Sequence, residues 1–212
     1  MGALVLLLMA ASRRSSDRAL LRDRPARSVA TKQAAVLNAD EVAALIDCAS
    51  PRDAALIALM AAGAMRVGEA TLLVWSDVDG CVVTIPGGVT KTRVGRSLTL
   101  PDQACKLLNQ WRQLCPPTKT GWVFPGLRGQ CLSVRAAQTA ISKLAATVGV
   151  DGVSSHSFRR SALTAAHEAG LSLKAVAEIS GHKSIGALER YLDQGVAKEK
   201  AEEARGLLFA SL

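Results

Sequence analysis

The hydrophobic periodicity of the chain changes between residues 81 and 100, and this change constrains the fold more than any other feature. Residues 81–85, which are rich in β-branched side chains, and residues 97–100 have the composition of β-strands, and glycine-rich breaks lie between them. This pattern predicts a β-hairpin. Helical periodicity and helix-capping residues dominate the sequence on both sides. The sequence therefore predicts an α+β fold that is mainly α, with one small antiparallel sheet.

The expected helices follow cap-forming residues, and several end at a glycine. Asn38 caps the first, Ser50 and Pro51 open the second, and the third begins at Val67. The later helices are expected at residues 103–114, 134–148, 158–169, 173–179 and 186–192, followed by a last amphipathic helix in AKEKAEEARGLLFASL.

The charge of the chain favours an anionic partner. The formal net charge is +8 over 212 residues, and aromatic residues make up only 3%. Seven basic and two acidic residues between Arg13 and Lys32 give that segment a net charge of +5. Two interpretations remain open for it: a solvated charge run, or an arm that follows a nucleic-acid backbone. We expect residues 1–35 to form a basic N-terminal arm and residues 36–212 to form the globular domain.

The cysteines and the N-terminal residues indicate in which cellular compartment the protein is expected. The five cysteines are scattered and no pair has CxxC spacing, so we expect reduced thiols in a cytoplasmic protein, without a disulfide or a structural zinc. The stretch MGALVLLLMAASRRSS has no basic residue before its apolar run, which argues against a signal peptide. The run is also too short to span a bilayer. We interpret it as the end of a helix from an upstream domain.

Residues 154–193 gather an unusual set of side chains. They contain all three histidines, the only tyrosine and two adjacent arginines. His156 and Arg159 are spaced i, i+3 at the start of a helix, a spacing that suits two groups gripping one phosphate. Alone, this pair is a weak signal, because a surface His–Arg pair has the same spacing.

The whole set is more specific than its parts. It comprises, in chain order, Arg66, Lys91, His156, Arg159, His182 and Tyr191. This order and spacing resemble the catalytic domain of the tyrosine recombinases, the phage integrase family. The resemblance covers residues 36–192. GAMRVGEATLLVWSDVD, with Glu69 three residues after the arginine, is similar to the first-arginine box of the family. HSFRRSALTAAHEAGLSLKAVAEISGHKSIGALERYL is similar to its second box.

The resemblance implies a helical catalytic domain with a small three-stranded antiparallel sheet. It implies that Tyr191 attacks a DNA phosphodiester and forms a 3′-phosphotyrosyl bond, which a 5′-hydroxyl later reverses without ATP. Lys91 is then the general acid for the leaving 5′-oxygen. Lys91 is identified by its TKT context, and Arg93 and Arg96 lie on the same hairpin.

The remaining members of the set are expected to handle the phosphate and its protons. By the resemblance, Arg66 and Arg159 hold the non-bridging oxygens. His182 donates a hydrogen bond to the phosphate, and His156 assists proton movement or binds the phosphate. Glu69 either braces the site or is a plain carboxylate at a helix start. We expect no metal and no cofactor, and we expect Arg160 to contact the DNA backbone or solvent.

The resemblance also implies partners. The expected partner is double-stranded DNA, bound by a homotetramer, with no membrane association. The segment KEKAEEARGLLFASL is expected either to dock on a neighbouring subunit or to pack on its own domain. The arm of residues 1–35 is expected to be a remnant of the core-binding domain that precedes the catalytic domain in the family.

Other functions remain open at this stage. A non-catalytic helix-turn-helix-like DNA-binding protein explains the charge but leaves Arg66 and Lys91 unexplained. An inactive truncated recombinase relic would bind DNA without cutting it. A type IB topoisomerase or a resolvase of hairpin ends would have the same active-site residues.

Overall fold

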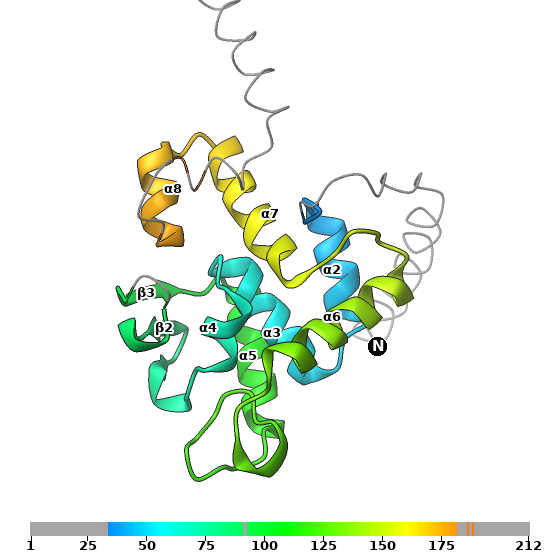
Figure 1. Cartoon of the computed structure of the whole chain (residues 1–212), viewed down its shortest axis with the longest axis vertical. Helices are drawn as coiled ribbons and strands as arrows, with labels where there is room; N and C mark the ends of the chain where they lie inside the picture. Colours follow the sequence, from blue (N-terminus) through cyan, green and yellow to red (C-terminus); the bar gives the residue numbers. More distant parts are fainter. Residues whose placement is uncertain (1–33, 91–92, 182–185, 187, 189–212) are drawn as a thin grey trace, which may run out of the picture.

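The computed structural model describes residues 34–90, 93–181, 186 and 188 (Figure 1). Lys91, His182, Tyr191 and the C-terminal segment lie outside the described residues, as does the arm before residue 34. The α-helices are α2 (Ala39–Asp47), α3 (Pro51–Ala62), α4 (Val67–Thr71), α5 (Asp102–Leu114), α6 (Val134–Val148), α7 (Ser155–Glu168) and α8 (Leu173–Ser180). The strands are β1 (Val78–Asp79), β2 (Val82–Ile85) and β3 (Arg96–Thr99), and short 3₁₀ turns cover Trp75–Asp77, Gly87–Val89 and Leu127–Gly129.

Helix α3 is the centre of the fold. Its start follows the predicted cap, because the side chain of Ser50 accepts a hydrogen bond from the backbone of Asp53, and Pro51 occupies the first turn. All residues from Ala54 to Met60 are buried, so α3 is covered on every side rather than along one stripe. Helices α2, α5, α6 and α7 all pack against it. The core is mainly aliphatic, as the scarcity of aromatic residues requires.

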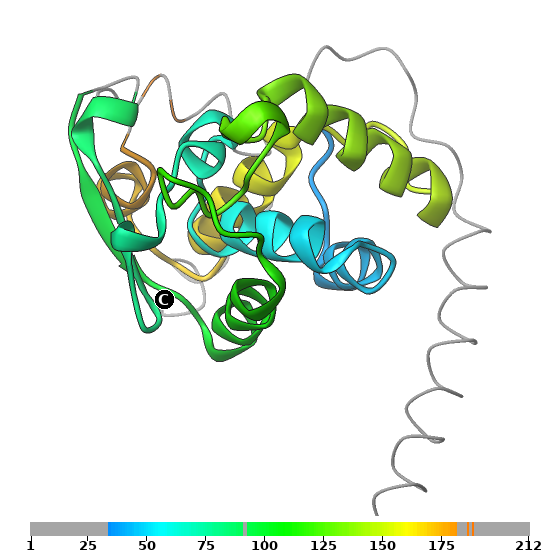
Figure 2. The same cartoon turned by 90° about the horizontal axis from the view of Figure 1, so that it is seen from below.

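The predicted sheet is confirmed and has three antiparallel strands in the order β1-β2-β3. Val83 and Ile85 of β2 are buried, whereas Val82 and Thr84 between them face outward. This alternation is the period-2 pattern of a sheet with one covered face. The sheet lies at one end of the molecule and α6 extends toward the opposite end (Figure 2).

Among the helices in the described residues, the boundaries follow the predictions with one clear exception, and the predicted boundaries at residues 186–192 and in the last helix stay predictions. Helix α6 runs from Val134 to Val148 after the Ser133 cap, as expected. Helix α7, expected from residue 158, begins at Ser155. The reason is a capping box: Ser157 Oγ accepts a hydrogen bond from the Ser154 backbone N–H, and the Ser154 side chain accepts one from His156. His156 therefore lies in the first turn of α7.

The prediction that all cysteines are reduced is wrong for one pair. Cys81, just before β2, forms a disulfide with Cys105 in the first half of α5, with a Cα–Cα distance of 5.3 Å. A backbone hydrogen bond from Leu100, just before α5, to the carbonyl oxygen of Cys81 helps to bring the two cysteines together. Their separation of 24 residues has no local spacing that sequence reasoning could have used. Cys131 and Cys115 remain thiols.

A small second core joins the C-terminal helices to the segment before α4. It consists of Ala64, Leu163 of α7, Val176 of α8 and Leu188. This packing holds α7 and α8 against the start of α4. In the described part of the chain, no helix has both the length and the apolar composition needed to cross a lipid bilayer.

Candidate active site

Arg66 and Glu69 form the first part of the site. Arg66 is the N-cap of α4, and Glu69 reaches back to it in a capping box. Glu69 Oε2 accepts the Arg66 backbone N–H at 3.0 Å, and Oε1 accepts Arg66 Nη1 at 2.8 Å. Glu69 is 2% exposed, whereas the side chain of Arg66 is 22% exposed. The carboxylate is therefore buried beneath a guanidinium that solvent still reaches.

A second arginine, from the sheet, contacts the same carboxylate. Arg96 Nη2 at the start of β3 donates to Glu69 Oε2 at 2.8 Å. Burial raises the pKa of the Glu69 carboxyl, but hydrogen bonds from Arg96 and the Arg66 backbone outweigh it. Together with the charge of Arg96, they hold this pKa below its usual value of 4.5. Glu69 is consequently a carboxylate held between two guanidinium groups.

Arg159 of α7 is the next residue of the site and is completely buried. Its Nη1 donates to the carbonyl oxygen of Ala64, two residues before Arg66. Its Nη2 donates to the carbonyl oxygen of Ser180 at 2.7 Å. One guanidinium of α7 thus joins the segment that enters α4 to the C-terminal end of α8. Arginine suits this position because its planar fork serves two acceptors at once.

The end of α8 also lies close to the sheet (Figure 1). Gly181 ends α8 in the left-handed conformation, with φ of 66°. A Cβ built on Gly181 would lie 3.7 Å from Arg96 Nη1. The structure therefore brings α4, β3, α7 and the end of α8 to one place. His182, the next predicted site residue, follows Gly181 directly in the sequence.

His156 and Arg160 have different environments from their neighbour Arg159. His156 is exposed in the first turn of α7, whereas Arg159, three residues on, is buried. Arg160 Nη1 donates to the carbonyl oxygen of Ala34. Arg160 is partly buried, so it is not the plainly solvent-exposed side chain of one expectation, and its expected contact with DNA stays a prediction. Arg160 holds the segment that leads into α2.

Close contacts join the residues just before positions 91–92 to those just after them. Thr90 is buried, and its hydroxyl lies 3.1 Å from the Gly87 carbonyl oxygen and 3.0 Å from that of Val94. A Cβ on Gly87 would lie 2.8 Å from the carbonyl oxygen of Arg93. Only glycine fits this close approach of two backbones.

Arg96 is the site residue that sequence reasoning did not single out. A signal for it was present. Arg96 pairs with Ile85 across the hairpin, and Ile85 is completely buried. Directly opposed residues of an antiparallel pair share one face. An arginine on the covered face requires a buried anion, and Glu69 supplies it.

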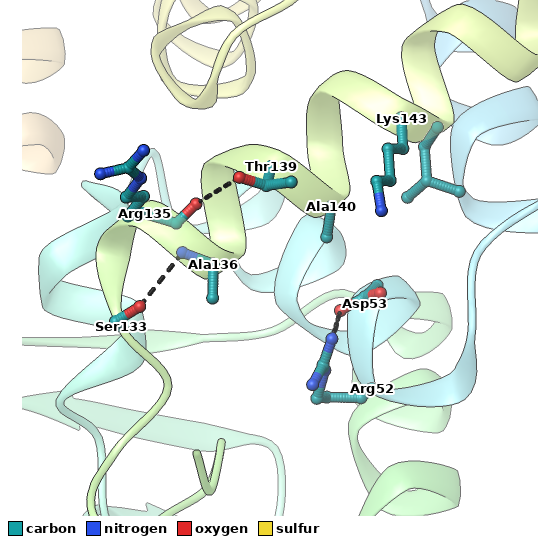
Figure 3. A pocket seen from close by; sticks show the side chains of 9 residues that line it. Arg52, Asp53, Ser133, Arg135, Ala136, Thr139, Ala140 and Lys143 are labelled. Carbon is teal, nitrogen blue, oxygen red and sulfur yellow. Dashed lines mark hydrogen bonds and ion pairs between the residues drawn. The ribbon is translucent and has the colours of Figure 1, made fainter. Parts of the chain in front are cut away.

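A second basic region lies away from these residues, in a shallow pocket between α3 and α6 (Figure 3). Arg52 and Asp53 border it from the start of α3, and Arg135 and Lys143 border it from α6. None of the predicted catalytic residues lines this pocket. We regard the arginine–carboxylate cluster as the chemical site, because buried charges converge there, whereas this pocket is open and carries exposed cations.

Comparisons with known proteins identify the family of the chain. The model of the phage integrase family matches residues 35–197. The chain is 30% identical over 164 residues to the tyrosine recombinase XerC of Xanthomonas axonopodis pv. citri, which covers 74% of this chain and 53% of the relative. It is 32% identical over 146 residues to XerC of Corynebacterium glutamicum, over 66% of this chain and 46% of the relative. The chain thus spans about half the length of these curated relatives.

Solved structures support the same fold. The crystal structure of XerA recombinase superposes with a TM-score of 0.72 at 23% identity, over 82% of this chain and 66% of that one. XerH recombinase bound to a palindromic difH substrate gives a TM-score of 0.66 at 22% identity, over 84% and 54%. The fold, the order of the predicted site residues and the family match lead to one conclusion. The chain belongs to the phage integrase family, the tyrosine recombinases.

Proposed function

We propose that this chain cuts and rejoins DNA strands in site-specific recombination through a 3′-phosphotyrosyl intermediate. Tyr191 is the nucleophile, and its oxygen displaces the 5′-oxygen of the neighbouring nucleotide from phosphorus. Lys91 protonates that leaving oxygen. The energy of the broken phosphodiester bond is retained in the tyrosyl ester, so a 5′-hydroxyl can rejoin the strand without ATP.

The other residues of the set stabilise the phosphate. Arg66 and Arg159 neutralise the non-bridging oxygens, where negative charge increases in the transition state. His182 donates a hydrogen bond to the phosphate, and His156 binds it or relays the proton of the tyrosine hydroxyl. Glu69 orients Arg66. The proposed chemistry uses only side chains of the protein and needs neither a metal nor a cofactor.

One observation carries this proposal. The buried Arg159 guanidinium connects the Ala64 carbonyl, next to the first-arginine box, with the Ser180 carbonyl, next to Gly181 and His182. The two boxes, almost a hundred residues apart, are thereby joined through a charged group that is costly to bury for packing alone. This connection supports a composite site built from both boxes.

The partners are part of the proposal. Double-stranded DNA is the substrate, and the net charge of +8 supports it. Several of the solved neighbours hold their substrates, among them XerH recombinase bound to a palindromic difH substrate and the Tn1549 transposon integrase in complex with a circular intermediate DNA. The active assembly that we propose is a homotetramer in the cytoplasm. The basic residues before residue 36 follow the DNA backbone, as an arm or as part of an upstream core-binding domain.

The experiment compares two adjacent arginines. Nicked DNA duplexes with pooled sequences trap a covalent intermediate, which a denaturing gel detects. Arg159→Lys keeps the charge but cannot serve two carbonyl oxygens as a planar fork, so we expect adduct formation to fall at least about a hundredfold. Arg160→Lys is the matched control, because Arg160 is the neighbouring arginine on α7 and donates to the carbonyl oxygen of Ala34 in the segment before α2, and its adduct yield should stay near wild type. Equal yields for Arg159→Lys and wild type would contradict the proposal.

A further inference from the structure

Arg96 occupies a position where a charged side chain is costly. It is the first residue of β3 and lies opposite the buried Ile85. Its side chain is 14% exposed. Among the described residues, its buried Nε has no hydrogen-bond acceptor. The ion pair with Glu69 at 2.8 Å is what compensates for burying this guanidinium.

The geometry makes Glu69 a shared acceptor. Oε2 receives Arg96 Nη2 and the Arg66 backbone N–H, while Oε1 receives Arg66 Nη1. One carboxylate thus lies between two guanidinium groups, and the three side chains together carry a net charge of +1. A simple Arg66–Glu69 pair would be neutral and would attract a phosphate less strongly. Arg96 restores the positive charge and competes for the carboxylate.

The groups that face Glu69 come from a small number of elements. Arg66 faces it from the start of α4, and Arg96 faces it from β3. Helix α3 packs against α4, and its buried residues from Ala54 to Met60 are all apolar. From α6, the side chain closest to Gly68 of α4 is Val134, which does not titrate. Within the described residues, the ionisation of Glu69 therefore depends on the two arginines and on burial.

We propose that Arg96 is a positioning residue for the DNA cleavage reaction: it keeps Glu69 ionised and fixed, so that Glu69 holds the Arg66 guanidinium toward the scissile phosphate. This inference rests on the proposed function. Arg96 acts through Glu69 and Arg66 and does not itself touch the reacting atoms. It also couples the β2–β3 segment, which contains Lys91, to α4, which Arg66 caps.

The test uses Arg96→Gln, Arg96→Lys and a charge-matched control, Lys106→Gln, whose exposed side chain lies on α5. The single-turnover rate of covalent adduct formation on the pooled nicked DNA is measured between about pH 5 and pH 8, with DNA binding measured in parallel. In protein without DNA, the ¹³C resonance of the Glu69 carboxyl is titrated. Thermal unfolding confirms that each variant is folded.

In Arg96→Gln we expect the rate to fall about tenfold to a hundredfold, with DNA affinity changed no more than in Lys106→Gln. The pKa of the Glu69 carboxyl should rise, because burial remains while the opposing hydrogen bond and charge are lost. The acid limb of the rate profile, where adduct formation slows at low pH, should move to higher pH together with this pKa. Arg96→Lys should return the carboxyl titration and part of the rate toward wild type, because it restores the charge. It also provides the comparison if Arg96→Gln does not fold.

Two outcomes separate this inference from the proposed function. If wild type forms an adduct but Arg96→Gln leaves both the Glu69 titration and the acid limb unchanged, Arg96 only ties the sheet to α4, and the inference is wrong. If wild type forms no adduct on any DNA, the proposed function fails. The Glu69 titration in the free protein then still decides whether Arg96 holds the carboxylate ionised.

Discussion

At the scale of single residues, the site depends on two buried charges, Glu69 and Arg159. Burial of an isolated charge costs several kcal/mol, and hydrogen bonds to good partners offset this cost. Glu69 has two arginines as partners, and Arg159 has two backbone carbonyl oxygens. Removing one partner leaves the other charge buried and uncompensated. These positions should therefore be sensitive to conservative substitutions.

Glu69→Gln should lower the free energy of unfolding by about 3 kcal/mol near pH 7, because two arginines lose a charged acceptor in a buried site. The folded-state pKa of Glu69 lies below the unfolded value, so its stabilisation is complete above the unfolded pKa. The stabilisation is lost as the pH falls through the folded pKa. The difference between wild type and variant, measured by urea denaturation, should therefore be constant near neutral pH and shrink below about pH 4.5.

Asp53→Asn is the matched control for this measurement. Asp53 pairs with Arg52 at 2.8 Å, but the Arg52 side chain is 34% exposed. A partly exposed pair contributes less than about 1 kcal/mol. If Glu69→Gln cost no more than Asp53→Asn, Glu69 would not be the ionised centre of the cluster.

The sequence identified some of these residues and missed others for physical reasons. The resemblance singled out Arg66 and left the role of Glu69 open, although the capping box that joins the two residues is local, at i, i+3. The family order of residues pointed to Arg159. The acceptors of Arg159, the carbonyls of Ala64 and Ser180, were not predictable, since any residue supplies a carbonyl and only tertiary packing selects it. Arg96 was assigned to the hairpin, but its contact with Glu69 spans 27 residues.

At the scale of elements, the β2–β3 connection is shaped by glycines in close backbone contact. Gly87→Ala should destabilise the protein by about 1–3 kcal/mol, since its Cβ would lie 2.8 Å from a backbone oxygen that cannot move alone. It should also slow adduct formation, because Lys91 lies in this segment. Gly88→Ala is the control: a Cβ there meets nothing within 4 Å. Thermal unfolding and the adduct rate should separate the two variants, and equal behaviour would contradict this account of the turn.

The disulfide ties the start of β2 to α5, and its loss gives a second prediction at this scale. Cys105→Ser should lower the free energy of unfolding by about 3 kcal/mol under oxidising conditions, because a loop of 24 residues is no longer closed in the unfolded chain. Under a strong reductant, the wild type and Cys105→Ser should become similar. Cys131→Ser, at a thiol outside this pair, should have little effect in either condition. A wild type that is insensitive to reductant would show that the disulfide does not contribute to stability.

The elements were predictable where local signals agreed. Helix α6 matched its predicted bounds because Ser133 is its cap and Gly149 closes it in the left-handed conformation. The start of α7 was misplaced because serines at 154, 155 and 157 offered competing caps. The two-residue strand β1 gave no periodic signal at all. Its pairing with β2 depends on the turn at Gly80, which has φ of 56°.

At the scale of the whole molecule, the excess of basic residues should govern DNA affinity. The logarithm of the association constant should fall linearly with the logarithm of salt concentration as counterions are released. Lys143→Gln, in the pocket between α3 and α6, should reduce the slope by about one. Lys106→Gln on α5 should leave it unchanged. Fluorescence anisotropy titrations at several salt concentrations measure both slopes. An unchanged slope for Lys143→Gln would show that the DNA does not contact this pocket.

The most direct test of the central claim, covalent DNA cleavage by this chain, is identification of the residue that becomes joined to DNA. Wild type and Tyr191→Phe are incubated with the pooled nicked duplexes, and the adduct is digested and sequenced by mass spectrometry. We predict an adduct for wild type alone, with the nucleotide attached to the peptide that contains Tyr191. An adduct of equal yield in Tyr191→Phe would contradict the account. So would salt-sensitive DNA binding by wild type without any adduct, which would instead indicate a DNA-binding protein that does not cut.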